Sequence, residues 1–128
     1  MERKDIIEFW VSEAEEAKEV AQHLFDRNDF SYALFFGHLA VEKLIKAIYV
    51  KNIDDNVPRS HNLPWLAKEA GVEIPADKLD ELIRITAFNL EARYPDYMKE
   101  FRKKCTRHFT KEELRKIGEV FKWLKSIL

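Results

Sequence analysis

Arg102 and His108 are the two residues whose types and spacing best suit chemistry on a phosphate group. A histidine can take the proton from the 2′-hydroxyl of RNA, and an arginine can neutralise the charge that develops on the phosphate. Such a pair cleaves RNA without a metal ion. A pattern this short also arises by chance, so the sequence leaves catalysis open.

The same pair lies in a segment, residues 99–116, that is rich in positive charge. The segment holds eight lysines and arginines against three glutamates, which gives +5, whereas the whole chain has −1 and the other residues therefore carry −6. This asymmetry is typical of a surface that binds phosphate or RNA. It also fits an ordinary solvated helix face.

A second group of candidate residues lies where a proline interrupts a helical pattern. The interruption contains Arg93, Tyr94, Asp96 and Tyr97. A turn needs only Gly, Asn, Ser or Pro, so an arginine and two tyrosines exceed what it requires. Because these residue types bind phosphates and bases, we predict that Arg93, Tyr94 and Tyr97 contact a nucleotide. The structural alternative is packing of Tyr94 and an ion pair between Arg93 and Asp96 or another carboxylate.

Lys43 and Lys46 are predicted to add positive charge to the same nucleotide site. They interrupt the most apolar part of the chain at helical spacing. Glu42 precedes Lys46 by four residues, which is the favourable order for an ion pair on a helix. The three charged residues therefore also fit a solvated helix edge.

The four histidines do not form a pattern that binds metal. None of His23, His38, His61 and His108 pairs with another histidine or with Cys105, the single cysteine, at metal-ligand spacing. The three glycines are scattered and form no phosphate loop. We therefore expect no metal and no cofactor. His38 is predicted to be a buried, hydrogen-bonded histidine and His61 to bond at a helix entry.

Composition indicates one helical domain covering residues 1–128. Only three glycines and four prolines are present, while 35% of the residues are charged.

No apolar stretch reaches the roughly 18 residues of a membrane span, and no signal-peptide pattern follows the N-terminus. We therefore expect a cytoplasmic protein that does not contact a membrane. A single glutamine beside many Lys, Arg and Glu residues is a thermophile-like composition.

Hydrophobic periodicity places these candidate residues on helices. Apolar residues recur at three- and four-residue steps in four long stretches: residues 4–27, 30–51, 75–94 and 110–128. Shorter helices are predicted over residues 61–71 and 95–106. The predicted fold class is all-α, an up-and-down four-helix bundle with one or two extra short helices.

Two of these helices carry further predictions. The last helix is predicted to begin at Thr110, because residues 110–113 have the form of a capping box. The second helix is apolar over an unusually wide arc, and its adjacent Phe35 and Phe36 point about 100° apart. Such a helix is either central in the bundle or in contact with a partner subunit, and we predict a homodimer.

Three segments in succession support a family resemblance. They are residues 38–47 with the His-Leu-Ala-Val-Glu-Lys pattern, residues 60–63 with Ser-His-Asn-Leu, and residues 92–96 with Ala-Arg-Tyr-Pro-Asp. Together with the final amphipathic helix they cover nearly the whole chain, which resembles a HEPN domain (higher eukaryotes and prokaryotes nucleotide-binding). The resemblance implies a helical bundle that forms a homodimer with a cleft at its two-fold axis.

The resemblance also implies a small prokaryotic protein encoded beside a minimal nucleotidyltransferase, in a pair of the toxin–antitoxin type. The active branch is a metal-independent ribonuclease with an Arg-x4–6-His motif, which Arg102 and His108 fit. In some pairs the transferase adds AMP to a tyrosine two residues after that histidine. This chain departs from the pattern with Lys103 after Arg102 and with Thr110 in place of that tyrosine.

One predicted function is therefore a homodimeric binding module for a nucleotide or nucleic acid, partnered with a minimal nucleotidyltransferase. In this hypothesis Arg93, Tyr94, Tyr97, Lys43 and Lys46 contact phosphate and base.

The alternative is a metal-independent endoribonuclease toxin in which Arg102 and His108 of both subunits meet in the dimer cleft. Convergence of these side chains in one cleft would favour the enzyme, and separate surfaces would favour the binding module.

Overall fold

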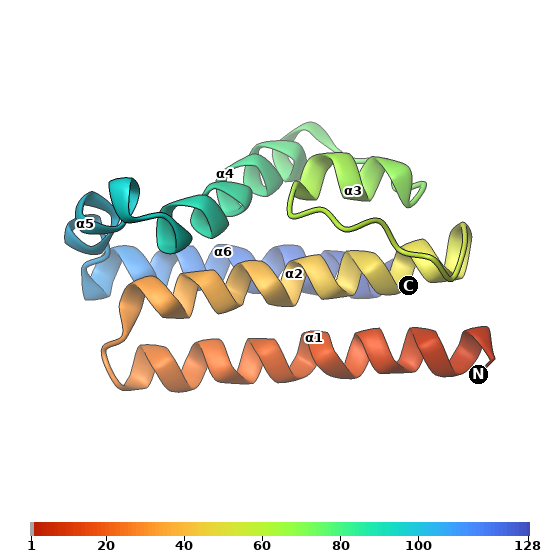
Figure 1. Ribbon diagram of the computed structural model, residues 1–128, viewed down its shortest axis with the longest axis horizontal. Helices are drawn as coiled ribbons and strands as arrows, with labels where there is room; N and C mark the ends of the chain where they lie inside the picture. The colour runs from red at the N-terminus through yellow and green to blue at the C-terminus, as the bar shows by residue number, and fades with distance from the viewer. Residues whose placement is uncertain (1) are drawn as a thin grey trace.

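The computed structural model describes residues 2–128, which form six α-helices and no strand (Figure 1). The helices are α1 (Arg3–Asp26), α2 (Phe30–Asn52), α3 (Leu63–Glu69), α4 (Ala76–Arg93), α5 (Pro95–Lys104) and α6 (Arg107–Ser126). The predicted all-α, up-and-down bundle of four long and two short helices is confirmed.

Helix α2 is the centre of the bundle. Figure 1 shows α1 along one side of it, α4 along the other and α6 behind. Twelve residues of α2 are buried, and Leu34, Leu44 and Ile45 have no exposed surface. The wide apolar arc is therefore explained mainly by neighbours in the same chain, as expected for a central helix.

Small residues allow the helices around α2 to approach closely. Ala14, Ala17 and Ala21 form the buried side of α1. On the side of α2 that faces α6, a Cβ added at Gly37 would lie 2.8 Å from Ile117 Cδ1. Backbones separated by so little side-chain volume can pack at short interaxial distances.

The prediction that the last helix begins at Thr110 is wrong. Helix α6 begins at Arg107, and the N-cap is Thr106, whose side chain accepts a hydrogen bond from the Phe109 N–H at 3.2 Å. Thr110 is fully buried in the first turn of α6, so its side chain packs instead of capping. Helix α3 is also shorter than the predicted range, residues 61–71. It begins at Leu63, because Asn62 caps the helix by accepting a hydrogen bond from the Trp65 N–H.

Helix α4 carries two apolar faces. Leu82, Ile85 and Phe88 are buried. Leu79 and Ile83, which belong to the same periodic pattern, are exposed at 37% and 55%. The bundle core thus uses only one of the two faces.

The break after α4 turns the chain back toward the start of α2. Tyr94 has extended backbone angles, φ −102° and ψ 130°, as a residue before proline favours, and Pro95 begins α5. The start of α6, which directly follows α5, then reaches the α1–α2 connection, where Arg107 donates to Asn28 Oδ1 at 2.8 Å. The break therefore brings the basic segment onto the N-terminal end of α2.

The same substitution at two glycines tests the close contact between α2 and α6. Gly118→Ala should raise the free energy of unfolding by about 0.5–1 kcal/mol, because a Cβ there meets nothing within 4 Å and alanine favours helix. Gly37→Ala should be about 1 kcal/mol less stable than Gly118→Ala, because overpacking against the buried Ile117 offsets the same helix preference of alanine. Urea unfolding of both variants measures the difference, and equal stabilities would contradict the contact.

Candidate functional site

One side of α2 remains partly open to solvent. Its residues recur at three- and four-residue steps and are half-buried or, for Tyr32, 43% exposed. We call this the α2 face, and it consists of Tyr32, Phe35, Phe36, Leu39, Lys43 and Lys46. Apolar rings and cations therefore alternate along a single helix surface.

Both predicted lysines lie on the α2 face, and both are paired with carboxylates. Lys43 Nζ lies 3.1 Å from Glu13 Oε1 of α1. Lys46 Nζ donates to Glu42 Oε2 at 3.0 Å and lies 5.3 Å from the centre of the Trp10 ring. Their charges are thus partly neutralised within the protein.

Two arginines from other helices reach the same face. The Arg93 guanidinium, at the end of α4, lies 5.7 Å from the Phe35 ring centre. The Arg102 guanidinium, from α5, lies 5.7 Å from the Tyr32 ring centre and donates to Tyr32 Oη at 3.2 Å. Within residues 2–128, no carboxylate oxygen is within 4 Å of either arginine, and the alternative Arg93–Asp96 pair is not formed. The structure therefore brings Lys43, Lys46, Arg93 and Arg102 to one side of α2.

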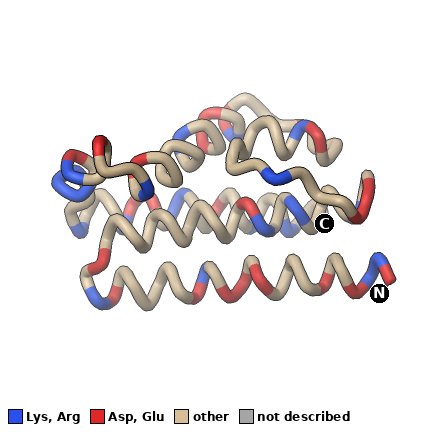
Figure 2. Tube along the Cα trace, in the orientation of Figure 1, with Lys and Arg blue, Asp and Glu red and all other residues tan. Residues whose placement is uncertain are grey.

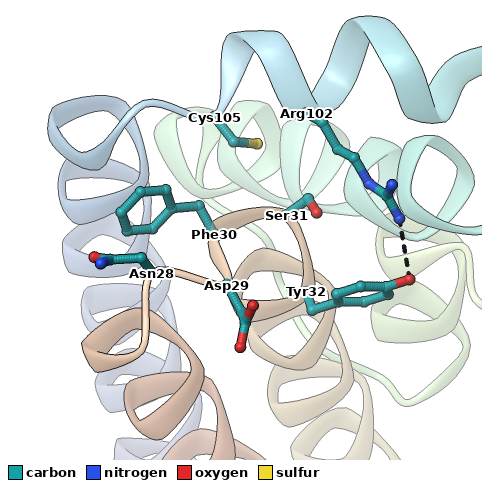
Figure 3. Close-up of a pocket in the computed structure, with 7 residues that line it drawn as sticks. All are labelled: Asn28, Asp29, Phe30, Ser31, Tyr32, Arg102 and Cys105. Atoms are coloured by element: carbon teal, nitrogen blue, oxygen red, sulfur yellow. Dashed lines mark hydrogen bonds between the residues drawn. The ribbon is translucent and has the colours of Figure 1, made fainter.

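Arg102 also lines a pocket of about 390 Å³ at the N-terminal end of α2 (Figure 3). The lining residues are Asn28, Asp29, Phe30, Ser31, Tyr32, Arg102 and Cys105. Burial raises the pKa of the Cys105 thiol to about 11, so the thiol stays protonated at neutral pH and is a poor nucleophile. The polar groups of this pocket can hold a ligand but include no activated nucleophile.

His108 is exposed in the first turn of α6 and does not line the Arg102 pocket. Arg102 is instead occupied with Tyr32. Within a single subunit the two candidate catalytic residues therefore do not share one pocket.

Tyr94 and Tyr97 flank the break between α4 and α5 and are 49% and 51% exposed. Tyr97 lines a pocket of about 260 Å³ together with Glu91, Asp96 and Glu100. Carboxylates repel a phosphate, so Tyr97 is better placed to contact a base than an anion.

A buried polar network next to the α2 face was not predicted from the sequence. His61 Nδ1 donates to Glu42 Oε1 at 2.7 Å, while Lys46 holds the other carboxylate oxygen. Glu42 is 3% exposed and His38, which donates from Nε2 to the His61 carbonyl at 3.1 Å, is fully buried. The only signal in the sequence was the family resemblance, because residues 19 positions apart along the chain meet only in the folded bundle.

This network explains the state of His38. Burial lowers the pKa of His38 below its usual 6.5, and the nearby Glu42 carboxylate only partly offsets that effect. The hydrogen bond to the His61 carbonyl also raises the pKa of His38, whereas the charges of His61 and Arg93 lower it. A neutral His38 is therefore the form that fits the folded protein.

Positive charge gathers at the end of the molecule formed by α5 and the start of α6 (Figure 2). Lys103, Arg115 and Lys116 are paired with glutamates of their own helices. Arg107 lies over the Phe25 ring at 4.8 Å instead. The predicted basic segment is thus divided between paired residues on α6 and a basic end around α5.

Residues 2–128 contain no group of three or more His, Cys, Asp or Glu side chains that could hold a metal ion. Over the same residues, no helix is both long and apolar enough to cross a membrane.

Comparisons with known proteins agree with this architecture. The family model described as HEPN domain matches residues 7–127. A solved structure, that of TT1696 from Thermus thermophilus, has a TM-score of 0.82 and 19% sequence identity, and the alignment covers 95% of this chain and 98% of that one. At this identity the likeness shows the fold alone. No curated protein matches the chain.

Stability should depend on pH through His38. Below about pH 6.5 the unfolded chain binds more proton at His38 than the folded chain does, so the free energy of unfolding falls as the pH falls toward the lowered pKa of the folded state. The slope from this residue is at most about 1.4 kcal/mol per pH unit. Unfolding at pH 7 and pH 5 should show a smaller loss for His38→Gln than for wild type. The exposed control His108→Gln should behave like wild type, and an unchanged slope in His38→Gln would contradict the assignment.

Proposed function

Because the chain belongs to the HEPN domain family, we propose that it is a homodimeric module that binds a nucleotide or nucleic acid through the α2 face. The observation that carries the proposal is the pair of arginines at this face. Arg93 and Arg102 come from two helices and have no carboxylate partner within the described residues.

An arginine without a carboxylate partner keeps its full charge for a ligand. Its planar guanidinium can donate two parallel hydrogen bonds to a phosphate. The rings of Phe35 and Tyr32 restrict where each guanidinium lies, so less side-chain freedom is lost on binding. Lys43 and Lys46 are proposed to add charge at longer range, because Glu13 and Glu42 already hold them.

The aromatic residues beside these cations suit bases rather than phosphates. Tyr94 follows Arg93 directly, and Tyr97 lies one turn further on. We propose that both tyrosines stack on or contact a base while the arginines hold the phosphate. Nucleotide and single-stranded nucleic acid satisfy this chemistry equally well.

The proposed partner is a minimal nucleotidyltransferase in a cytoplasmic toxin–antitoxin pair, as the family resemblance implies. Modification of this chain at Thr110 is not part of the proposal. Thr110 occupies the position of the modified tyrosine but is fully buried, so a transferase cannot reach it in the folded state.

Arginine substitutions test the binding proposal. Arg93→Ala and Arg102→Ala should each weaken binding of a short single-stranded RNA about tenfold and reduce the salt dependence by about one charge. Arg115→Ala is the matched control, since Arg115 is equally a surface arginine but is paired with Glu112 and Glu119. Fluorescence anisotropy at several salt concentrations measures both effects. Losses no larger than that of Arg115→Ala would refute the assignment.

The alternative function is the metal-independent endoribonuclease, and the accessibility of its two residues favours it. Arg102 has no carboxylate partner in the described part of the chain, and His108 is exposed. Both side chains can therefore meet RNA, although one subunit does not place them in one pocket.

RNA cleavage in EDTA tests this alternative. An active enzyme should lose cleavage at least about a hundredfold in His108→Ala, which removes the general base, and keep it in His23→Ala. His23 is the control because it is an exposed histidine on another helix. Intact RNA with the wild-type protein would rule the enzyme out and leave the binding module.

A further inference from the structure

The unused apolar face of α4 has a pattern that is symmetric about its middle. Large side chains stand at Leu79, Ile83 and Leu90, exposed at 37%, 55% and 45%. The centre holds the small residues Thr86 and Ala87. Because these positions are three, four or seven apart, they form one stripe along the helix, and it contains no charged residue. We call this stripe the α4 stripe.

We propose that the α4 stripe is the surface on which a second copy of this chain docks, with the two α4 helices antiparallel. Pairing about the point between Thr86 and Ala87 places Ile83 against Leu90 of the partner subunit. Ala87 at the centre lets the two helices approach closely, whereas Thr86 beside it already accepts a hydrogen bond from the Leu63 N–H at the start of α3. A two-fold interface needs a surface that complements itself, and a symmetric stripe meets that requirement.

A groove lies at one end of the α4 stripe, and the exposed ring of Tyr94 lies at the other end. The two can fit together when the helices pair antiparallel. The groove has a volume of about 370 Å³ and lies beside Leu79, between α3 and the start of α4. Its other lining residues are Pro64, Trp65, Lys68, Val72 and Ile74. Tyr94, just past the end of α4, is 49% exposed. Antiparallel pairing brings Tyr94 of the partner subunit to this mainly apolar groove, and the contact occurs twice. In this dimer the ring of Tyr94 is occupied by the groove, so the base contact proposed above falls to Tyr97.

The exposed apolar side chains of this surface supply about half of the area that a standard dimer interface needs. Leu79, Ile83, Leu90, Tyr94 and Trp65 are each exposed by 37–55%. At about 200 Å² for a large side chain, they offer roughly 450 Å² per subunit, which is about half of the roughly 800 Å² that a standard interface takes from each partner. The polar residues on either side of the stripe must supply the rest.

This arrangement determines where the proposed binding faces lie. In an antiparallel pair the two-fold axis is perpendicular to both α4 helices. Rotation about it therefore places the same flank of each α4 helix on the same side of the dimer. Arg93 and the α2 face belong to one flank, so both α2 faces point the same way. The ends of α4 that lead to Arg102 and His108 lie at opposite ends of the interface. The inference rests on the homodimer of the proposed function, and it does not bring the two Arg102–His108 pairs together.

Sedimentation equilibrium of the full chain tests the surface. Ile83→Glu should weaken dimerisation at least about thirtyfold, since a central apolar contact is replaced by a charge. Phe9→Glu is the matched control, because Phe9 is 54% exposed on α1, away from the stripe. Both sites are exposed, so helix content by circular dichroism should remain that of wild type. A monomeric wild-type protein, or an Ile83→Glu dimer as tight as Phe9→Glu, would overturn the proposal.

Engineered cysteines test the antiparallel register. Ile83→Cys and Leu90→Cys chains, mixed and oxidised, should form a disulfide-linked dimer faster than either chain alone. The native Cys105 is buried and gives little background. Faster linking of like chains would indicate parallel pairing and overturn the arrangement.

The same variants separate this inference from the proposed function. An Ile83→Glu monomer that still binds RNA weakly through Arg93 supports both. A dimer through another surface overturns the α4 stripe and leaves phosphate binding intact. A dimer through the stripe that shows no RNA binding overturns the function alone.

Discussion

The buried carboxylate of Glu42 is the constraint on which the arrangement of this molecule depends. Removing a carboxylate from water costs several kcal/mol unless other groups replace its hydration. Lys46 supplies one partner from the same helix, and His61 supplies the other from the segment before α3. His38 then binds the His61 backbone. The segment that follows α2 is thereby fixed against α2, and α3 and α4 begin from a defined place.

The position of the arginines follows from that anchor. Helix α4 runs back along α2 and ends with Arg93 over Phe35. The proline after Tyr94 then turns α5 so that Arg102 reaches Tyr32. The carboxylates near the α2 face are used by Lys43 and Lys46, which leaves Arg93 and Arg102 as the cations of this face with most of their charge available. The fold thus separates charges that stabilise the bundle from charges that can hold a ligand.

The sequence predicted the helices well because each is encoded by local periodicity and by prolines. The prediction of where α6 begins was wrong. Both Thr106 and Thr110 are residues that can cap a helix, and only the burial of Thr110 in the folded protein decides between them. The sequence also missed the Glu42–His61 bond, since local patterns carry no information about contacts between distant segments. The two faces of α4 could not be separated for the same reason. Candidate residues were found by type, but their grouping on α2 required the fold.

The central claim is that Arg93 and Arg102 hold phosphate at the α2 face. The most direct measurement is NMR of the arginine Nε–Hε signals while a short single-stranded RNA is added to the wild-type protein. We expect the Arg93 and Arg102 signals to shift together and saturate at one RNA concentration, while the Arg115 signal stays in place. Unchanged Arg93 and Arg102 signals at saturating RNA, or shifts confined to α6, would contradict it.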